Sequence, residues 1–195
     1  MTETDLDVLI VGAGISGIDA AYHLRQRHPN RRFAILEQQE SFGGTWRTHR
    51  YPGARSDSDL YTFGFGWKPW TGVPLATAEE ICAYLDEAMS ENDLHRHVRY
   101  RHRVVAADWQ GDHWRLLVDG PDGRQAPITC RFLWMCQGYY RHEAGYLPDF
   151  AGMDSFAGRI VHPQTWPQDL DYSGQRVIVI GSGATAATIV PAMAG

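Results

Sequence analysis

Short apolar runs and one amphipathic stretch open the chain. Residues 7–11 (DVLIV) and 33–37 (FAILE) are nearly continuous apolar runs, which is typical of strands buried on both faces of a parallel sheet. Between them, apolar residues recur at helical spacing from Ile18 to Leu24. The pattern predicts a strand, a helix and a second strand, the start of a parallel α/β fold.

The middle of the chain predicts one helix and then three strands. Residues 76–94 carry apolar residues at helical spacing, and Thr77 with Glu80 forms a capping box at their start. The strand-like segments that follow are residues 98–109, 113–120 and 128–138. Because the last of them is an almost unbroken apolar run, we expect it to return to the main parallel sheet.

Glycines after the first run have the spacing of a dinucleotide-binding turn. Gly12 permits the tight turn, Gly14 lets the backbone approach a pyrophosphate, and Gly17 lets the helix lie close to the sheet. Glu37 ends the second run, where its carboxylate can accept hydrogen bonds from ribose hydroxyls. Strand, turn, helix, strand and acidic residue together predict a bound dinucleotide.

Two more glycines and many aromatic residues follow Glu37. Gly43 and Gly44 would allow a further close approach along a long cofactor, which suits FAD better than NAD. The aromatic residues are Trp46, Tyr51, Tyr61, Phe63, Phe65, Trp67 and Trp70. They fit either a buried hydrophobic insertion or a wall for a flat isoalloxazine ring, and the composition favours neither.

The glycine spacing returns near the end of the chain. Residues 177–186 (VIVIGSGATA) predict a strand over 177–180, then Gly181, Gly183 and Ala186 in the permitted GxGxxA form, then a helix. Two such motifs imply two cofactors, or one cofactor and a ligand-free turn. Because no second strand follows, we expect a fragment of a longer protein or a chain that needs a partner chain to complete this domain.

Composition and charge exclude several classes of function. The 195 residues include 18 Lys and Arg against 23 Asp and Glu, a net charge of −5, so no overall basic field favours nucleic acid. The start (MTETDLD) lacks the pattern of a secretory signal, and no apolar run is long enough for a membrane span. Cys82, Cys130 and Cys136 form no CxxC pair, which favours a reducing, cytoplasmic setting.

A cluster of histidines and arginines lies at residues 95–103. His95 and His97 have the HxH spacing of metal ligands, but their cationic neighbours oppose a divalent ion. A local nucleic-acid patch is the other functional alternative. We interpret the cluster as a solvated strand face with arginines alternating outward.

The segment between the two glycine motifs carries a family resemblance. Residues 156–167 read FAGRIVHPQTWP, and together with GGTW, RYPGARSDSD and the two glycine motifs they resemble type I Baeyer–Villiger monooxygenases, within the flavoprotein monooxygenases. They look most like the branch that includes the mycobacterial prodrug-activating monooxygenase. The resemblance covers essentially the whole chain.

The resemblance implies an α/β flavoprotein with two Rossmann-like dinucleotide-binding domains. Residues 1–150 would be the N-terminal part of the FAD domain, 151–173 the linker, and 174–195 the start of the NADPH domain. FAD would be held by Gly12, Gly14, Gly17, Glu37, Gly44, Thr45, Trp46 and Asp57, with Val104 near the adenine. NADPH would lie against Gly181, Gly183 and Ala186.

The resemblance also implies roles for the remaining residues. Asp57 would be a charged group near the flavin and the nicotinamide. His162 and Trp166 would serve domain movement rather than bond-making. We expect the family's active-site arginine to lie beyond residue 195.

The implied activity is insertion of one oxygen atom from O₂ into a ketone, giving an ester or lactone, or oxygenation at sulfur. An N-hydroxylating monooxygenase and a catalytically silent FAD-binding module remain open, as does proteolysis of a longer enzyme. A disulfide reductase does not fit, because it needs a redox CxxC.

Overall fold

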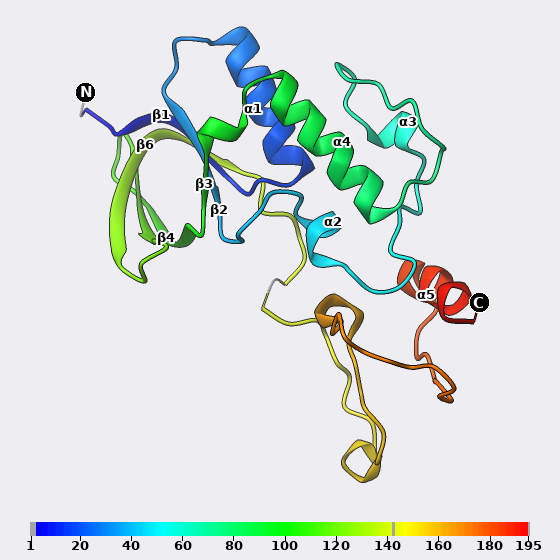
Figure 1. Ribbon diagram of the computed structural model, residues 1–195. Helices are drawn as coiled ribbons and strands as arrows, with labels where there is room; N and C mark the ends of the chain where they lie inside the picture. The colour runs from blue at the N-terminus through cyan, green and yellow to red at the C-terminus, as the bar shows by residue number, and fades with distance from the viewer. Residues whose placement is uncertain (1–2, 142, 195) are drawn as a thin grey trace. The chain divides into compact units, whose positions relative to one another are not determined.

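The computed structural model describes residues 3–141 and 143–194, which fold as two compact units. One unit is formed by Met1–Gly44 and Cys82–Gly138, and the other by Thr45–Ile81 and Tyr139–Gly195. The helices and strands, labelled in Figure 1 where there is room, are β1 (Leu6–Val11), α1 (Ile15–Arg27), β2 (Phe33–Glu37), α2 (Thr45–Thr48), α3 (Leu60–Phe63), α4 (Ala78–Glu91), β3 (Val98–Tyr100), β4 (Arg103–Trp109), β5 (Trp114–Asp119), β6 (Gln125–Met135) and α5 (Ala184–Ala194). Short 3₁₀ helices lie at His95–His97, Met153–Ser155 and Pro163–Thr165.

The first unit is built on a six-stranded sheet in the order β3-β2-β1-β6-β5-β4. β1 pairs in parallel with β2 and β6, and β2 with β3, whereas β5 runs antiparallel to β6 and β4. The predicted strands at 7–11 and 33–37 are confirmed, as is the return of the run at 128–138 to the parallel sheet.

The capping box at the start of α4 is confirmed too. Thr77 Oγ1 accepts a hydrogen bond from the N–H of Glu80, and Glu80 Oε2 accepts one from the N–H of Thr77.

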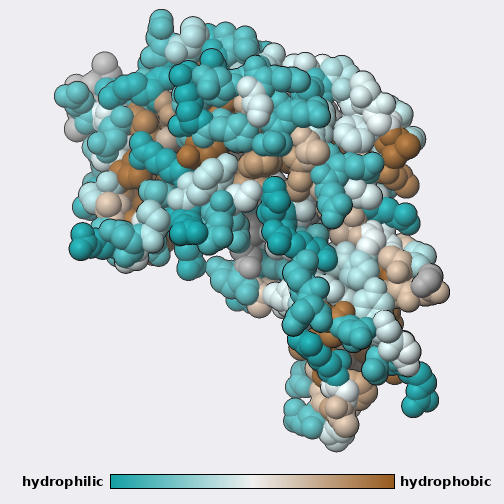
Figure 2. Space-filling view, viewed as in Figure 1, coloured by the Kyte–Doolittle hydropathy of each residue, from teal (hydrophilic) through white to brown (hydrophobic). Residues whose placement is uncertain are grey.

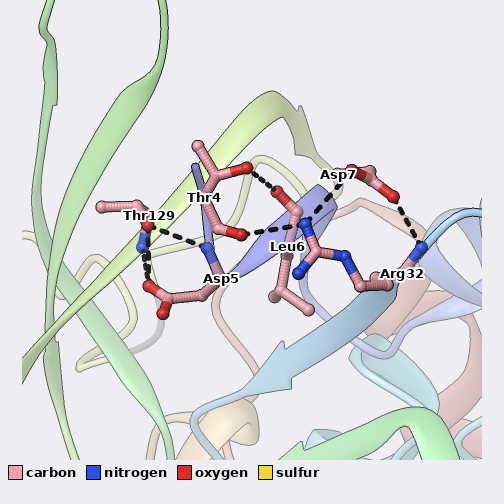
Figure 3. Close-up of polar contacts among 6 residues, drawn as sticks. All are labelled: Thr4, Asp5, Leu6, Asp7, Arg32 and Thr129. Carbon is pink, nitrogen blue, oxygen red and sulfur yellow. Dashed lines mark hydrogen bonds and ion pairs between the residues drawn. The ribbon is translucent and has the colours of Figure 1, made fainter. Parts of the chain in front are cut away.

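Polar side chains fix the start of β1 to both neighbouring strands (Figure 3). Asp5 Oδ2 accepts hydrogen bonds from the N–H and hydroxyl of Thr129 at 2.8 and 2.7 Å. On the other side, the N–H of Arg32 donates to Asp7 Oδ2 at 2.9 Å, and the Arg32 side chain to the carbonyl of Thr4. These bonds lower the pKa of both carboxyls: the Thr129 side chain is the main cause at Asp5, and the Arg32 N–H at Asp7.

The sheet is covered on both faces. On one face a Cβ placed on Gly17 of α1 would lie 3.5 Å from Ile10 Cγ2, so α1 rests directly on β1. On the other face, Leu9 and Leu36 pack in one cluster with Leu116 and Val118 of β5. Figure 1 shows how β4 to β6 curve to make this second layer. Burial from two sides explains why the parallel strands are continuous apolar runs.

Part of the strand surface stays open. Phe132 and Trp134 of β6 pair with Val8 and Ile10, on the face that carries α1, and they are 57% and 39% exposed. Figure 2 shows hydrophobic residues interrupting the hydrophilic surface over the region of β4 and β6. In the described part of the chain, no helix is long and apolar enough to cross a membrane.

Two strand predictions were wrong. Residues 98–109 form two strands rather than one, because the chain turns at Arg101 with a φ of +56°. There the N–H groups of Arg101 and His102 donate to the carbonyls of Gln39 and Glu37. Residues 177–180 form no strand, because within the described residues no neighbouring strand pairs with them.

The second unit is mostly loop and short helix. The Asp59 carboxylate caps α3 by accepting from the N–H of Thr62 at 2.9 Å. Arg55 forms an isolated antiparallel bridge with Thr77. Within α5, Thr188 and Ile189 are buried.

Candidate functional site

The turn between β1 and α1 is closed so tightly that only glycine fits at two positions. Gly12 has a φ of +102°, and a Cβ there would lie 2.5 Å from the carbonyl oxygen of Cys136. A Cβ on Gly17 would lie 1.9 Å from the carbonyl oxygen of Gly12. Gly12 thus turns against the end of β6, and Gly17 brings α1 against the turn, as the sequence predicted for the shape of this motif.

Gly14 and Gly44 place two stretches of bare backbone side by side. A Cβ on Gly44 would lie 3.1 Å from the Cα of Gly14, and the N–H of Gly43 donates to the carbonyl of Ala13 at 3.0 Å. Gly14 is the N-cap of α1, and the first helical turn holds no acidic residue. The positive end of the α1 dipole therefore meets no carboxylate in its first turn, which suits a phosphate.

Glu37 anchors this turn from the end of β2. The side chain is buried, with Oε2 accepting from the N–H of Ala13 at 2.8 Å and Oε1 from the N–H of Gln39 at 2.9 Å. The sequence pointed to a ribose contact and missed this anchoring of the loop. Each carboxylate oxygen has two acceptor sites, so one on each oxygen is left after these bonds.

Val104 lies in β4, beside the turn that leads back to Glu37. It is partly buried against the cluster of Leu9, Leu36 and Leu116. The N–H of His102, two residues earlier, donates to the carbonyl of Glu37 at 2.9 Å. Glu37 and Val104, which the resemblance places at the adenosine end of FAD, are therefore connected through the hydrogen-bonded turn at His102.

Thr45, Trp46 and Asp57 belong to the second unit. Asp57 is exposed and accepts from the hydroxyl of Ser58 at 3.3 Å. Its negative charge contributes to the raised pKa of Tyr140, after the larger effects of the Tyr139 hydrogen bond and burial. Asp57 and Tyr140 are therefore electrostatic neighbours.

The aromatic stretch packs largely on itself. Trp46 meets Phe63 edge-to-face with ring centroids 5.9 Å apart, and Phe65 stacks on Trp67 at 4.6 Å. Phe65 is buried, whereas Tyr61 is 61% exposed. This self-packing favours a hydrophobic insertion for Phe65, and Trp46 stays the candidate for a cofactor contact.

His162 is held by its own backbone and by a glycine that sequence reasoning missed. Nδ1 accepts from the N–H of Gln164 at 3.1 Å, so the ring proton resides on Nε2. A Cβ on Gly145 would lie 1.9 Å from His162 Cε1, so the imidazole lies flush against that backbone. Nothing in the sequence near Gly145 signals this contact. Trp166 meets Tyr172 edge-to-face at 6.2 Å.

The second glycine motif is open where the first is closed. Gly181 has a φ of +137°, and among the described residues no atom lies within 4 Å of a Cβ placed on Gly181 or Gly183. Helix α5 begins at Ala184 and includes Ala186, with Pro191 inside it. Residues 177–180 lead into the turn as exposed coil, with Ile178 79% exposed.

The histidine and arginine cluster is a solvated strand face only in part: Arg99 of β3 and Arg103 of β4 are exposed, as the pattern indicated, but the cluster begins in a short helix. His95–His97 form a 3₁₀ helix in which the His97 ring stacks on Phe33 at 4.1 Å. Arg96 pairs with Asp93 at 3.0 Å and Arg101 with Glu40 at 2.8 Å. No group of His, Cys, Asp and Glu able to hold a metal ion occurs in the ranges that the structure describes.

Comparison with known proteins agrees with this geometry. The FAD-containing monooxygenase EthA of Mycobacterium tuberculosis is 50% identical over 197 residues, which cover 100% of this chain and 40% of that protein. A crystal structure of OTEMO in complex with FAD and NADP superposes with a TM-score of 0.83 at 34% identity, covering 99% of this chain and 37% of that one. For oxidized steroid monooxygenase bound to NADP the TM-score is 0.80 at 33% identity, with 95% and 36% covered. The chain spans about two fifths of the length of its curated relatives.

Two family models together match residues 10–194. Residues 10–74 match an NAD(P)-binding Rossmann-like domain, which agrees with the predicted α/β class. Residues 74–194 match the flavin-binding monooxygenase-like model. The resemblance drawn from the glycine motifs and from FAGRIVHPQTWP is thereby confirmed. Since the second match spans more than half of the 195 residues, the chain belongs to the flavin-binding monooxygenase-like family.

Proposed function

We propose that this chain carries the FAD site and the first part of the NADPH site of a monooxygenase that inserts one oxygen atom of O₂ into a ketone, giving an ester or lactone. Oxygenation of a substrate at sulfur is the second reaction that we propose for it. The observation that carries the proposal is the cradle of bare backbone at Gly14 and Gly44, at the start of α1 and anchored by Glu37.

The residues of the first unit fit the adenosine diphosphate half of FAD. The α1 N-terminus would receive the pyrophosphate over Gly14, where no side chain intervenes. Glu37 would use its remaining acceptor sites for the ribose hydroxyls while it holds Ala13 in place. Val104 would contact the adenine. Bound FAD would supply the redox chemistry, hydride acceptance from NADPH and activation of O₂, while these residues hold and orient it.

Residues of the second unit would serve the reacting end. Thr45 and Trp46 would contact the flavin side of the cofactor, and Asp57 would set the charge near the flavin and nicotinamide. Aromatic residues around Trp46 would exclude water from that end. Gly181, Gly183 and Ala186 at the start of α5 would receive the NADPH pyrophosphate on the free N–H groups of that helix end.

The neighbours support the cofactor assignment. OTEMO is described in complex with FAD and NADP, and steroid monooxygenase bound to NADP. EthA is described as FAD-containing. An N-hydroxylating monooxygenase is the alternative reaction class, and a silent FAD-binding module the alternative without catalysis.

An absorbance spectrum of the purified 195-residue chain, followed by anaerobic NADPH, tests the proposal. We expect a yellow protein whose flavin bands bleach. Adding O₂ with a ketone, a thioether or an amine in parallel, to a longer protein that also carries the active-site arginine expected beyond residue 195, then assigns the reaction class from the oxygenated product. Bound flavin with no bleaching would support the silent module, and a colourless protein would contradict FAD binding by this chain.

A further inference from the structure

The loop that carries Asp57 makes a close contact with helix α5. We infer that Gly53 is a positioning residue: it seats α5, and with it the Gly181–Ala186 turn, on the loop of residues 51–59. The inference deepens the proposed function and rests on it, since it concerns how the NADPH motif is held relative to Asp57.

Two features make position 53 specific for glycine. Its φ is +77°, a conformation that L side chains rarely adopt. A Cβ there would lie 2.6 Å from the carbonyl oxygen of Thr188 and 2.7 Å from Cβ of Ala192, one turn further along α5. Figure 1 shows α5 beside the segment that follows α2. The loop backbone is therefore in contact with one face of the helix.

Hydrogen bonds hold the loop of residues 51–59 in place near Gly53. The N–H of Ala54 donates to the carbonyl of Tyr51, and the carbonyl of Ala54 accepts from Ala78 at 2.9 Å. Ser56 is buried: its N–H donates to the carbonyl of Ala76 at 2.8 Å, and its Oγ accepts from the N–H of Ala76 at 3.1 Å. Because these bonds hold both sides of Gly53, an added side chain would displace the helix rather than the loop.

Among the described residues, the glycines of the second motif make no close contact of their own. A Cβ on Gly181 or Gly183 would meet no atom within 4 Å in the described chain, and residues 177–180 have no sheet to join. The buried residues of α5 are Thr188 and Ile189, at and beside the contact with Gly53. A shift of the helix at this point would carry Gly183 and Ala186 with it, while Asp57, four residues after Gly53, stays on the loop of residues 51–59.

Gly53→Ala tests the inference, with Gly174→Ala as its matched control. Gly174 also has a left-handed φ, +68°, and lies in the same unit, but within the described residues no atom is within 4 Å of its added Cβ. The control therefore carries the backbone strain without the clash. Both variants are made in the 195-residue chain.

Three measurements separate the outcomes. Amide hydrogen exchange in residues 187–194 needs no cofactor, and we expect it to rise at least tenfold in Gly53→Ala only. Flavin content should match the control, while the rate of flavin reduction at saturating NADPH falls at least tenfold. A merely destabilised protein with intact flavin would not show this fall.

Equal hydrogen exchange in the two variants would contradict the inference that Gly53 holds α5 in place. Increased hydrogen exchange in Gly53→Ala with an unchanged rate of flavin reduction would contradict the role of Gly53 in positioning the Gly181–Ala186 turn. A wild-type chain that holds flavin but is not reduced contradicts NADPH use by this chain, and the hydrogen-exchange result alone then decides whether Gly53 holds α5 in place.

Discussion

The two glycine motifs have the same spacing but opposite structural support. At the first, the Gly12 turn is enclosed by the end of β6, and Gly17 lies against the turn itself. At the second, Gly181 and Gly183 have open space around them within the described chain, and the apolar residues before them are exposed coil. The first turn is therefore shaped before any ligand arrives, whereas the second depends on what packs against it.

Among the described residues, the enclosed turn is the one that follows a paired strand. Residues 7–11 and 177–180 are similarly apolar, yet only the first run forms a strand, because β2 and β6 flank it. A strand satisfies its backbone N–H and C=O groups through neighbours, so an apolar run alone forms no sheet. Side chains add to the first site through the Asp5 and Asp7 contacts, and among the described residues none does so at 177–180.

The largest expected effect is on stability at the enclosed turn. Gly12→Ala forces a Cβ to within 2.5 Å of the Cys136 carbonyl at a φ of +102°, and we expect a loss of about 4 kcal/mol in the free energy of unfolding. Gly181→Ala, with the same change in open space, should cost about 1 kcal/mol from backbone strain. Urea unfolding followed by fluorescence measures both. Similar losses in the two variants would contradict the contrast between the turns.

The next effect concerns binding at the first turn. A Cβ on Gly14 has ordinary room, 3.7 Å from Gly44 Cα, so Gly14→Val should fold. Its side chain would occupy the place of the pyrophosphate, and we expect FAD affinity to fall at least about a hundredfold, or about 2.7 kcal/mol. Flavin per protein after gel filtration is the measurement. His162→Ala, far along the chain in the linker, should retain flavin. Near wild-type flavin in Gly14→Val would contradict the assignment of this turn.

A third effect comes from the carboxylate that anchors the turn. Glu37→Ala leaves the N–H groups of Ala13 and Gln39 without their acceptor, and because Ala13 is fully buried we expect a loss of about 2 kcal/mol in apoprotein stability. Glu40→Ala is the control, since its ion pair with Arg101 is exposed and is worth about 0.5 kcal/mol or less. Apoprotein unfolding separates this role from ribose binding. Equal effects of the two substitutions would show that Glu37 does not hold the loop.

Much of the first site was predictable because its signals are local. The strand runs, the capping box and the glycine spacing all act within one or two turns of chain, and each gave the observed element. The anchoring of Ala13 by Glu37, the packing of His162 on Gly145 and the contact of Gly53 with α5 join residues far apart in sequence. No periodicity encodes such contacts. The strand at 177–180 failed for the same reason, since its formation depends on neighbours that its own residues do not specify.

The smallest effect sharpens the comparison at the edge of the first site. Thr129 lowers the pKa of Asp5, so the contact stabilises the fold above the unfolded value of about 3.9 and is lost as the pH falls through the lower folded value. Because Asp5 is exposed, the coupling is expected to be only about 0.5 kcal/mol. A double-mutant cycle of Asp5→Asn and Thr129→Val, measured by urea unfolding at pH 7 and again in acid below the unfolded pKa, should give that coupling at the higher pH and a smaller one at the lower. A coupling near zero at pH 7 would mean that β1 is held to β6 by its backbone ladder and packing alone, and the side-chain contacts would then no longer distinguish the first glycine motif from the second.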